Sequence, residues 1–131
     1  MGISMGGIIG FYLLSQTDKV DHFYGVITTP NYLAFDPEQE APIKKENPDA
    51  YAHALKVLTR LNPIERYHEW NFKTIDMFHG TKDEVVPLNG PQMFYDQYKS
   101  DNIHLKTYST DHRITPEMFD DILKTMKSYL K

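Results

Sequence analysis

The spacing of apolar positions changes several times along the chain, and each spacing predicts a different element. A nearly continuous apolar run, Ile8–Leu14, follows a cluster of glycines and predicts a helix that is buried on most sides. The β-prone runs 23–28 and 74–78 predict strands, and the first has the continuous apolar character of a parallel strand covered on both faces. Residues 103–108 alternate between apolar and polar and predict a third strand.

Two further helices are indicated by their first residues. Asn89-Gly90-Pro91 opens a helix that runs to about Lys99, and Thr115-Pro116 opens the last helix of the chain. Acidic residues lie near the start of the last helix and lysines near its end, in agreement with the helix dipole. Its expected apolar face consists of Met118, Phe119, Ile122, Leu123, Met126 and Leu130.

Residues 29–71 have a different pattern, in which five prolines punctuate the sequence. Asn47-Pro48 is typical of a helix start, and the residues that follow at helical spacing are Tyr51, Leu55, Leu58 and Leu61. We interpret residues 29–71 as a partly helical insertion between two strands. The order helix, strand, insertion, strand, helix, strand, helix predicts an α/β fold with a mostly parallel sheet and flanking helices.

Composition narrows the class of protein. The chain has 131 residues, 40% of them hydrophobic, which suits one domain with a real core and excludes a disordered chain. The net charge is −4 with no basic stretch, which argues against nucleic-acid binding. The absence of cysteine excludes disulfides, cysteine zinc sites and a cysteine nucleophile. No apolar run approaches the roughly 20 residues of a membrane span, and no signal peptide is evident, so we expect a soluble, cytoplasmic protein without membrane attachment.

The first candidate for chemistry is Ser4, which lies in the string Gly2-Ile3-Ser4-Met5-Gly6-Gly7 and matches G-x-S-x-G. A nucleophilic serine on a tight turn between a strand and a helix needs small neighbours, because its backbone is strained and the helix packs closely. The N–H of Met5 would then face a developing oxyanion. The alternative is a glycine-rich turn or an anion-binding helix start.

Two more motifs follow predicted strands. Asp83 lies in the string His-Gly-Thr-Lys-Asp-Glu-Val-Val-Pro, which occupies 79–87, and His112 lies between the last strand and the last helix. Separately, Asp83 could be a turn residue and His112 a solvated one, which is the reading we prefer for His22, His53, His68 and His104. Together, serine, acid and histidine occur in the order found in α/β-hydrolases, each after a predicted or implied strand.

With these motifs the sequence resembles the α/β-hydrolase superfamily, and in particular small bacterial esterases of its prolyl-oligopeptidase-like and dienelactone-hydrolase-like branch. The resemblance extends over residues 2–28 and 70–131. It implies that Ser4 is the nucleophile, Asp83 the acid and His112 the base of a cofactor-free serine hydrolase, and that Met5 N–H supplies half of the oxyanion hole. It also implies a carboxylesterase acting on short acyl esters, a small-molecule substrate.

By the same resemblance, residues 1–131 form a partial domain that corresponds to the C-terminal half of the fold, with residues 29–71 as a cap over the site. Met1 stands where the strand that delivers the serine should end. Tyr32 and Phe35, with Leu33 and Tyr51, are candidates for an acyl pocket, although bulky residues in such a segment more often form its own small core.

Two acidic residues depart from the family pattern. Asp111 replaces the usual glycine before the histidine, and a carboxylate there could favour the protonated imidazole. Asp76 lies inside a predicted buried strand, where a charge is costly without a partner. Its neighbours in sequence include His79 and Lys82, and it is a weaker alternative to Asp83 as the acid.

Two rival functions remain open. The first is a non-catalytic remnant that self-associates or pairs with another chain through an exposed sheet edge. The second, a nucleotide-binding α/β domain, leaves the acid and histidine motifs unexplained. No metal-ligand spacing is evident among the histidines.

Overall fold

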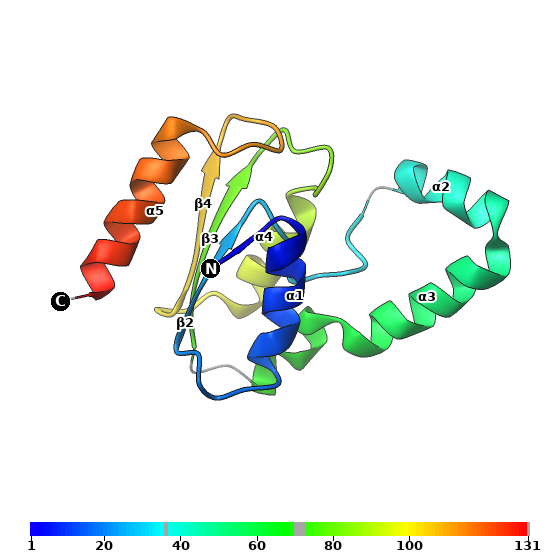
Figure 1. Cartoon of the computed structure of the whole chain (residues 1–131), viewed down its shortest axis with the longest axis horizontal. Helices are drawn as coiled ribbons and strands as arrows, with labels where there is room; N and C mark the ends of the chain where they lie inside the picture. Colours follow the sequence, from blue (N-terminus) through cyan, green and yellow to red (C-terminus); the bar gives the residue numbers. More distant parts are fainter. Residues whose placement is uncertain (36, 70–72, 131) are drawn as a thin grey trace.

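The computed structural model describes residues 1–35, 37–69 and 73–130, and it forms a parallel α/β sheet with helices on both faces (Figure 1). The four strands lie in the order β1-β2-β3-β4, and every neighbouring pair is parallel. The elements are β1 (Gly2–Ile3), α1 (Met5–Leu14), β2 (His22–Val26), α2 (Pro37–Glu46), α3 (Pro48–Leu61), η1 (Pro63–Glu69), β3 (Thr74–Gly80), α4 (Asn89–Tyr98), β4 (Ile103–Tyr108) and α5 (Pro116–Tyr129). The predicted α/β fold class is therefore confirmed.

Side chains of the strands alternate between the two faces of the sheet and pack into two separate hydrophobic cores. On one face of the sheet, Phe11 of α1 and Phe94 of α4 pack against strand residues such as Ile75. On the other face, Met118 and Ile122 of α5 pack against a second set of strand residues. Figure 1 shows the resulting layers, with α5 on one side of the strands and α1 and α4 on the other. Burial on both faces explains why the run 23–28, which contains most of β2, is continuously apolar in the sequence.

The insertion contains helices α2 and α3, which form a helical arm, and residues 29–35 before them are not helical. Helices α2 and α3 pack mainly against each other and stand away from the sheet in Figure 1, and neither contains a buried residue. The Asn47 side chain caps α3 by accepting from Ala50 N, as the Asn-Pro start predicted. The apolar stripe of α3 is left open, since Leu55 and Leu58 are both exposed.

Two expectations about the helices need correction. Helix α1 begins at Met5, three residues before the apolar run, because the glycines after the serine are already helical. On α5 only part of the predicted apolar face is covered: Met118 and Ile122 are buried, while Phe119, Leu123 and Leu130 are exposed. Among the described residues, no helix combines the length and the apolar character needed to cross a membrane.

Candidate active site

Ser4 occupies a sharp turn between β1 and α1. Its φ of 49° and ψ of −120° are rare for a residue with a side chain, and such a conformation costs on the order of 1–3 kcal/mol. The Ser4 N–H donates to Val26 O at 2.9 Å, which continues the pairing of β1 with β2 up to the turn. The strand on one side and the helix on the other hold the serine in this conformation, at the carboxyl edge of the sheet.

The glycines around Ser4 differ in what they make possible. A Cβ on Gly2 would lie 2.5 Å from the Gly7 Cα, and a Cβ on Gly7 would lie 2.4–2.6 Å from three side-chain atoms of Thr28. A Cβ on Gly6 would meet nothing within 4 Å. The close packing of the turn therefore depends on Gly2 and Gly7, and Gly7 lies one residue beyond the G-x-S-x-G pattern.

Asp83 lies in the loop after β3, and its carboxylate is fully buried. One oxygen, Oδ1, accepts hydrogen bonds from Val85 N at 2.9 Å and Val86 N at 2.8 Å. The other oxygen, Oδ2, lies 2.8 Å from His112 Nδ1. The two backbone donors fix the carboxylate, so its second oxygen has one defined direction.

His112 joins the acid to the serine. Its Nε2 lies 2.9 Å from Ser4 Oγ, while its Nδ1 faces Asp83. Because an ionised carboxylate can only accept, the proton of a neutral imidazole belongs on Nδ1 and leaves Nε2 free to accept the serine hydroxyl proton. The structure thus brings Ser4, Asp83 and His112 into one chain of hydrogen bonds, with each residue after the carboxyl end of a different strand.

Close packing holds the acid and histidine loops together. Thr81 N donates to Tyr108 O at 2.8 Å, and Lys82 N donates to Thr110 O at 2.9 Å. A Cβ on Gly80 would lie 2.4 Å from Thr110 O, so only glycine allows the loops to come this close. This close approach accounts for the glycine of the His-Gly motif.

His79 is a site residue whose role the sequence did not reveal. It is 1% exposed, and its Nε2–H donates to Val86 O at 2.8 Å, across the base of the acid loop. Burial lowers the pKa of His79 below its usual value, so the fold favours the neutral ring. The only signal in the sequence was its position directly after the predicted strand 74–78 and four residues before Asp83.

Asp111, the unexpected acid beside His112, has a partner of its own. Both of its oxygens bind the Arg113 guanidinium, at 2.5 Å from Nε and 2.8 Å from Nη2. This hydrogen-bonded pair lowers the pKa of Asp111 and offsets its negative charge. The effect expected from a bare carboxylate next to the histidine is therefore reduced.

Asp76 does not belong to this site. Its Oδ2 lies 2.6 Å from His22 Nε2 and its Oδ1 lies 2.8 Å from His104 Nδ1. The reason is the parallel register, which places residues of β2 and β4 on either side of β3. Our expectation that His22 and His104 are merely solvated was wrong, because both rings bind the Asp76 carboxylate.

Of the four candidate pocket residues, the two tyrosines form hydrogen bonds with other parts of the chain. Tyr32 is buried against α1 and donates its hydroxyl proton to Ile8 O at 2.6 Å, and burial raises its pKa to about 12. Tyr51 donates to Glu40 within the arm, Leu33 is exposed, and Phe35 is half-buried. None of these contacts involves the serine, the acid or the histidine.

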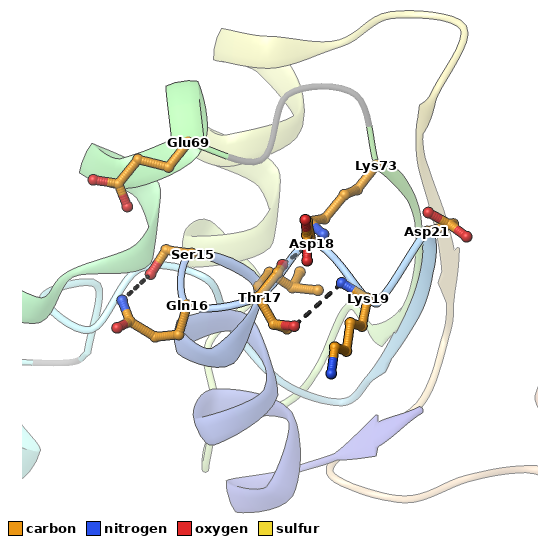
Figure 2. Close-up of a pocket in the computed structure, with 9 residues that line it drawn as sticks. Ser15, Gln16, Thr17, Asp18, Lys19, Asp21, Glu69 and Lys73 are labelled. Atoms are coloured by element: carbon orange, nitrogen blue, oxygen red, sulfur yellow. Dashed lines mark hydrogen bonds between the residues drawn. The ribbon is translucent and has the colours of Figure 1, made fainter.

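Two cavities differ in their relation to His112. One, of about 460 Å³, is lined by His112 and five neighbours, namely Lys82, Glu84, Val85, Asp111 and Arg113. The other, of about 640 Å³, lies at the end of α1 and is lined by residues 14–19, Asp21, Glu69 and Lys73 (Figure 2). This larger cavity borders the amino ends of β2 and β3, and of the two cavities only the smaller one is lined by a residue of the candidate site, His112. The described part of the chain contains no cluster of side chains suited to a metal ion.

Comparisons by sequence and by structure give different results. The sequence matches no protein-family model, and a search of the curated proteins also finds no match. The structure is similar to TT1662 from Thermus thermophilus, with a TM-score of 0.76, 16% identity and coverage of 99% of this chain and 53% of that one. It is also similar to the esterase Pf2001 of Pyrococcus furiosus, with a TM-score of 0.66, 20% identity and coverage of 99% and 52%.

A third similar structure is the monoacylglycerol lipase of Paleococcus ferrophilus, with a TM-score of 0.69, 14% identity and coverage of 98% of this chain and 66% of that one. The chain has the fold of an α/β-hydrolase. It spans about half the length of the first two structures. This fold explains why a serine on a strand-to-helix turn, an acid and a histidine meet at the carboxyl edge of the sheet.

Proposed function

We propose that this chain carries the catalytic residues of a serine hydrolase, specifically a carboxylesterase that acts on short acyl esters. The observation that carries the proposal is the continuous hydrogen-bonded chain from Ser4 Oγ through the His112 ring to the buried Asp83 carboxylate. Hydrogen bonds in this arrangement activate the serine hydroxyl, which is otherwise a weak nucleophile.

The geometry supports the following sequence of steps. Ser4 Oγ attacks the ester carbonyl carbon while His112 Nε2 takes the hydroxyl proton. His112 then gives that proton to the leaving alcohol, and the acyl group remains on Ser4. Water attacks the acyl-enzyme with the same histidine as base, and the acid product leaves. Asp83 stays ionised throughout and stabilises the imidazolium.

Stabilisation of the oxyanion begins at Met5. As the first residue of α1, its N–H has no carbonyl one turn earlier to bind, and it lies at the positive end of the helix. That N–H is therefore available to the developing negative charge on the carbonyl oxygen.

The substrate class rests on two observations. The cavity beside His112, of about 460 Å³, lies in the lower part of the range for small-molecule sites, about 300–1,000 Å³. Two of the similar structures are an esterase and a monoacylglycerol lipase, both of which act on esters. Acylaminoacyl peptidases are also among the similar structures, so the preference for a short ester over a long peptide depends on the small size of the cavity.

The test is labelling of the 131-residue chain with a fluorophosphonate probe, followed by hydrolysis of p-nitrophenyl acetate. Ser4→Ala should abolish both, and Ser15→Ala, at the far end of α1, should leave both unchanged. Mass spectrometry of the labelled protein should place the adduct on Ser4. Absence of Ser4-dependent labelling in a sample that circular dichroism shows to be folded would overturn the proposal.

A second candidate function is a non-catalytic chain that associates with a second copy of itself. The observation in its favour is an apolar stripe on α1, where Met5, Ile9 and Leu13 are 72%, 56% and 51% exposed. Size-exclusion chromatography with light scattering tests it. A dimer without Ser4-dependent turnover would support this candidate, and a monomer would count against it.

A further inference from the structure

Two residues in the described parts of the chain, glycines aside, have positive φ, and they lie close together. They are Ser4, with φ 49°, and Ile27, with φ 44°, which follows β2 directly. A β-branched residue seldom adopts this conformation, so the turn at Ile27 is imposed by its surroundings. Ile27 N donates to Phe78 O at 2.8 Å, which fixes the turn against β3.

The turn at Ile27 directs the next residue, Thr28, toward the serine. Thr28 Oγ1 donates to Ser4 O at 2.7 Å, and the residue is 2% exposed. Two other donors reach the same oxygen from the first turn of α1, Gly7 N at 3.0 Å and Ile8 N at 3.2 Å. The hydroxyl of Thr28 is thus the nearest of the three donors and the only one from outside the helix.

The carbonyl of Ser4 belongs to the same peptide group as the N–H of Met5. A trans peptide is planar, so its C=O and its N–H point in opposite directions and turn together. A group that fixes the direction of the Ser4 carbonyl therefore also fixes the direction of the Met5 N–H. The same contact restrains the backbone that carries Ser4 Oγ.

We propose that Thr28 is a positioning residue for the proposed hydrolase: its hydroxyl, through the Ser4 carbonyl, aims the Met5 N–H at the oxyanion. The proposal rests on the proposed function for its catalytic consequence. Thr28 itself touches neither the substrate nor the reacting atoms. Its effect is greatest where negative charge develops on the carbonyl oxygen, that is, in the transition states of acylation and deacylation.

The test uses two pairs of variants that differ only in the hydroxyl. Thr28→Val keeps the volume of the wild-type residue and removes the hydroxyl, and Thr28→Ser and Thr28→Ala form a smaller pair with and without it. With p-nitrophenyl acetate we expect Thr28→Val to lower kcat about 10- to 100-fold, because loss of a whole oxyanion donor costs about 10²–10³. KM should stay within about two-fold of the wild-type value, because the contact stabilises the transition state and not the bound substrate. Thr28→Ser should retain most of kcat, and Thr28→Ala should lose it.

A trifluoromethyl ketone provides the readout that a purely structural role would not move. It adds to Ser4 as an oxyanion, so its affinity should fall in Thr28→Val by the same factor as kcat. A Thr28→Val variant with wild-type kcat and wild-type inhibitor affinity would overturn the proposal. So would an equal loss in Thr28→Ser and Thr28→Ala, because that result assigns the effect to the methyl group.

The two proposals can fail separately. Absence of Ser4-dependent turnover in the wild-type chain refutes the proposed function alone. The contact is then tested by NMR, through the carbonyl ¹³C shift of Ser4 and the amide shifts of Met5. We expect both sets of shifts to change in Thr28→Val and in Thr28→Ala but to stay near the wild-type values in Thr28→Ser. Unchanged shifts in both hydroxyl-free variants would overturn the assignment of Thr28.

Discussion

Alanine at Gly7 and at Gly6 should have opposite effects on stability, although the two residues are neighbours in one helix. At Gly7 the new Cβ would lie 2.4–2.6 Å from Thr28, about 1 Å closer than an ordinary contact, and Thr28 is too buried to move aside. Overpacking of this kind costs about 1–3 kcal/mol. Alanine also gains up to about 1 kcal/mol of helix propensity over glycine, which offsets part of that cost. We therefore expect Gly7→Ala to lower the free energy of unfolding by about 1–2 kcal/mol.

Gly6→Ala is the matched control, because its Cβ would meet nothing within 4 Å while its gain in helix propensity is similar. Its free energy of unfolding should stay level or rise by up to about 1 kcal/mol. The measurement is urea unfolding followed by circular dichroism, with the m-value checked for equality among the three proteins. Equal stability of the two variants would refute the argument that Thr28 is what excludes a side chain at Gly7.

Three more substitutions test separate contacts. Asp83→Asn should keep the hydrogen bonds from Val85 N and Val86 N, but its amide would donate to His112 Nδ1 and so move the imidazole proton to Nε2. This change of tautomer should lower esterase kcat about 10⁴-fold with little change in the urea midpoint of unfolding. Retained activity would contradict the proposed role of Asp83. Asp76→Asn should lower the free energy of unfolding by about 2 kcal/mol, since one of its two histidine partners loses an acceptor, and an unchanged midpoint would count against this cluster. Burial lowers the pKa of His79, so between pH 7 and 5.5 the unfolded chain takes up a proton at His79 that the folded chain does not. The free energy of unfolding should therefore fall as the pH falls, by up to about 1.4 kcal/mol per pH unit. His79→Gln should flatten that slope, whereas the control His68→Gln, at an exposed histidine, should leave it unchanged.

The fold class was predictable because burial on both faces leaves a plain mark on the sequence. Apart from His22 and a few polar residues of β3 such as Asp76, strands β2 and β3 are apolar on both sides, since one face packs against α1 and α4 and the other against α5. The acid and histidine motifs were predictable for a related reason: each follows a strand, and parallel strands place their carboxyl ends at one edge. Given that common edge, the order of the three motifs along the sequence was enough to predict that Ser4, Asp83 and His112 lie together.

What could not be predicted depends on contacts across the sheet. The histidine partners of Asp76 lie on neighbouring strands, so only the register reveals them. Thr28 reaches Ser4 because Ile27 adopts a positive φ, and no feature of an isoleucine in a sequence announces that conformation. The exposure of Leu55 and Leu58 on α3 could not be predicted either, because helical spacing predicts an apolar face but not whether another element covers it.

The base of the helical arm has a consequence for how the sheet is assembled. Ile64 N donates to Pro30 O, and Asn62 Nδ2 donates to Asn31 Oδ1, so the chain returns close to the point where it left. The arm is held at this base and packs mainly on itself. Once its ends have met, the long connection between β2 and β3 behaves as a short loop. The entropy of joining these two strands is then set by the few residues outside the arm, and we expect β2 and β3 to pair faster than their separation in the sequence suggests.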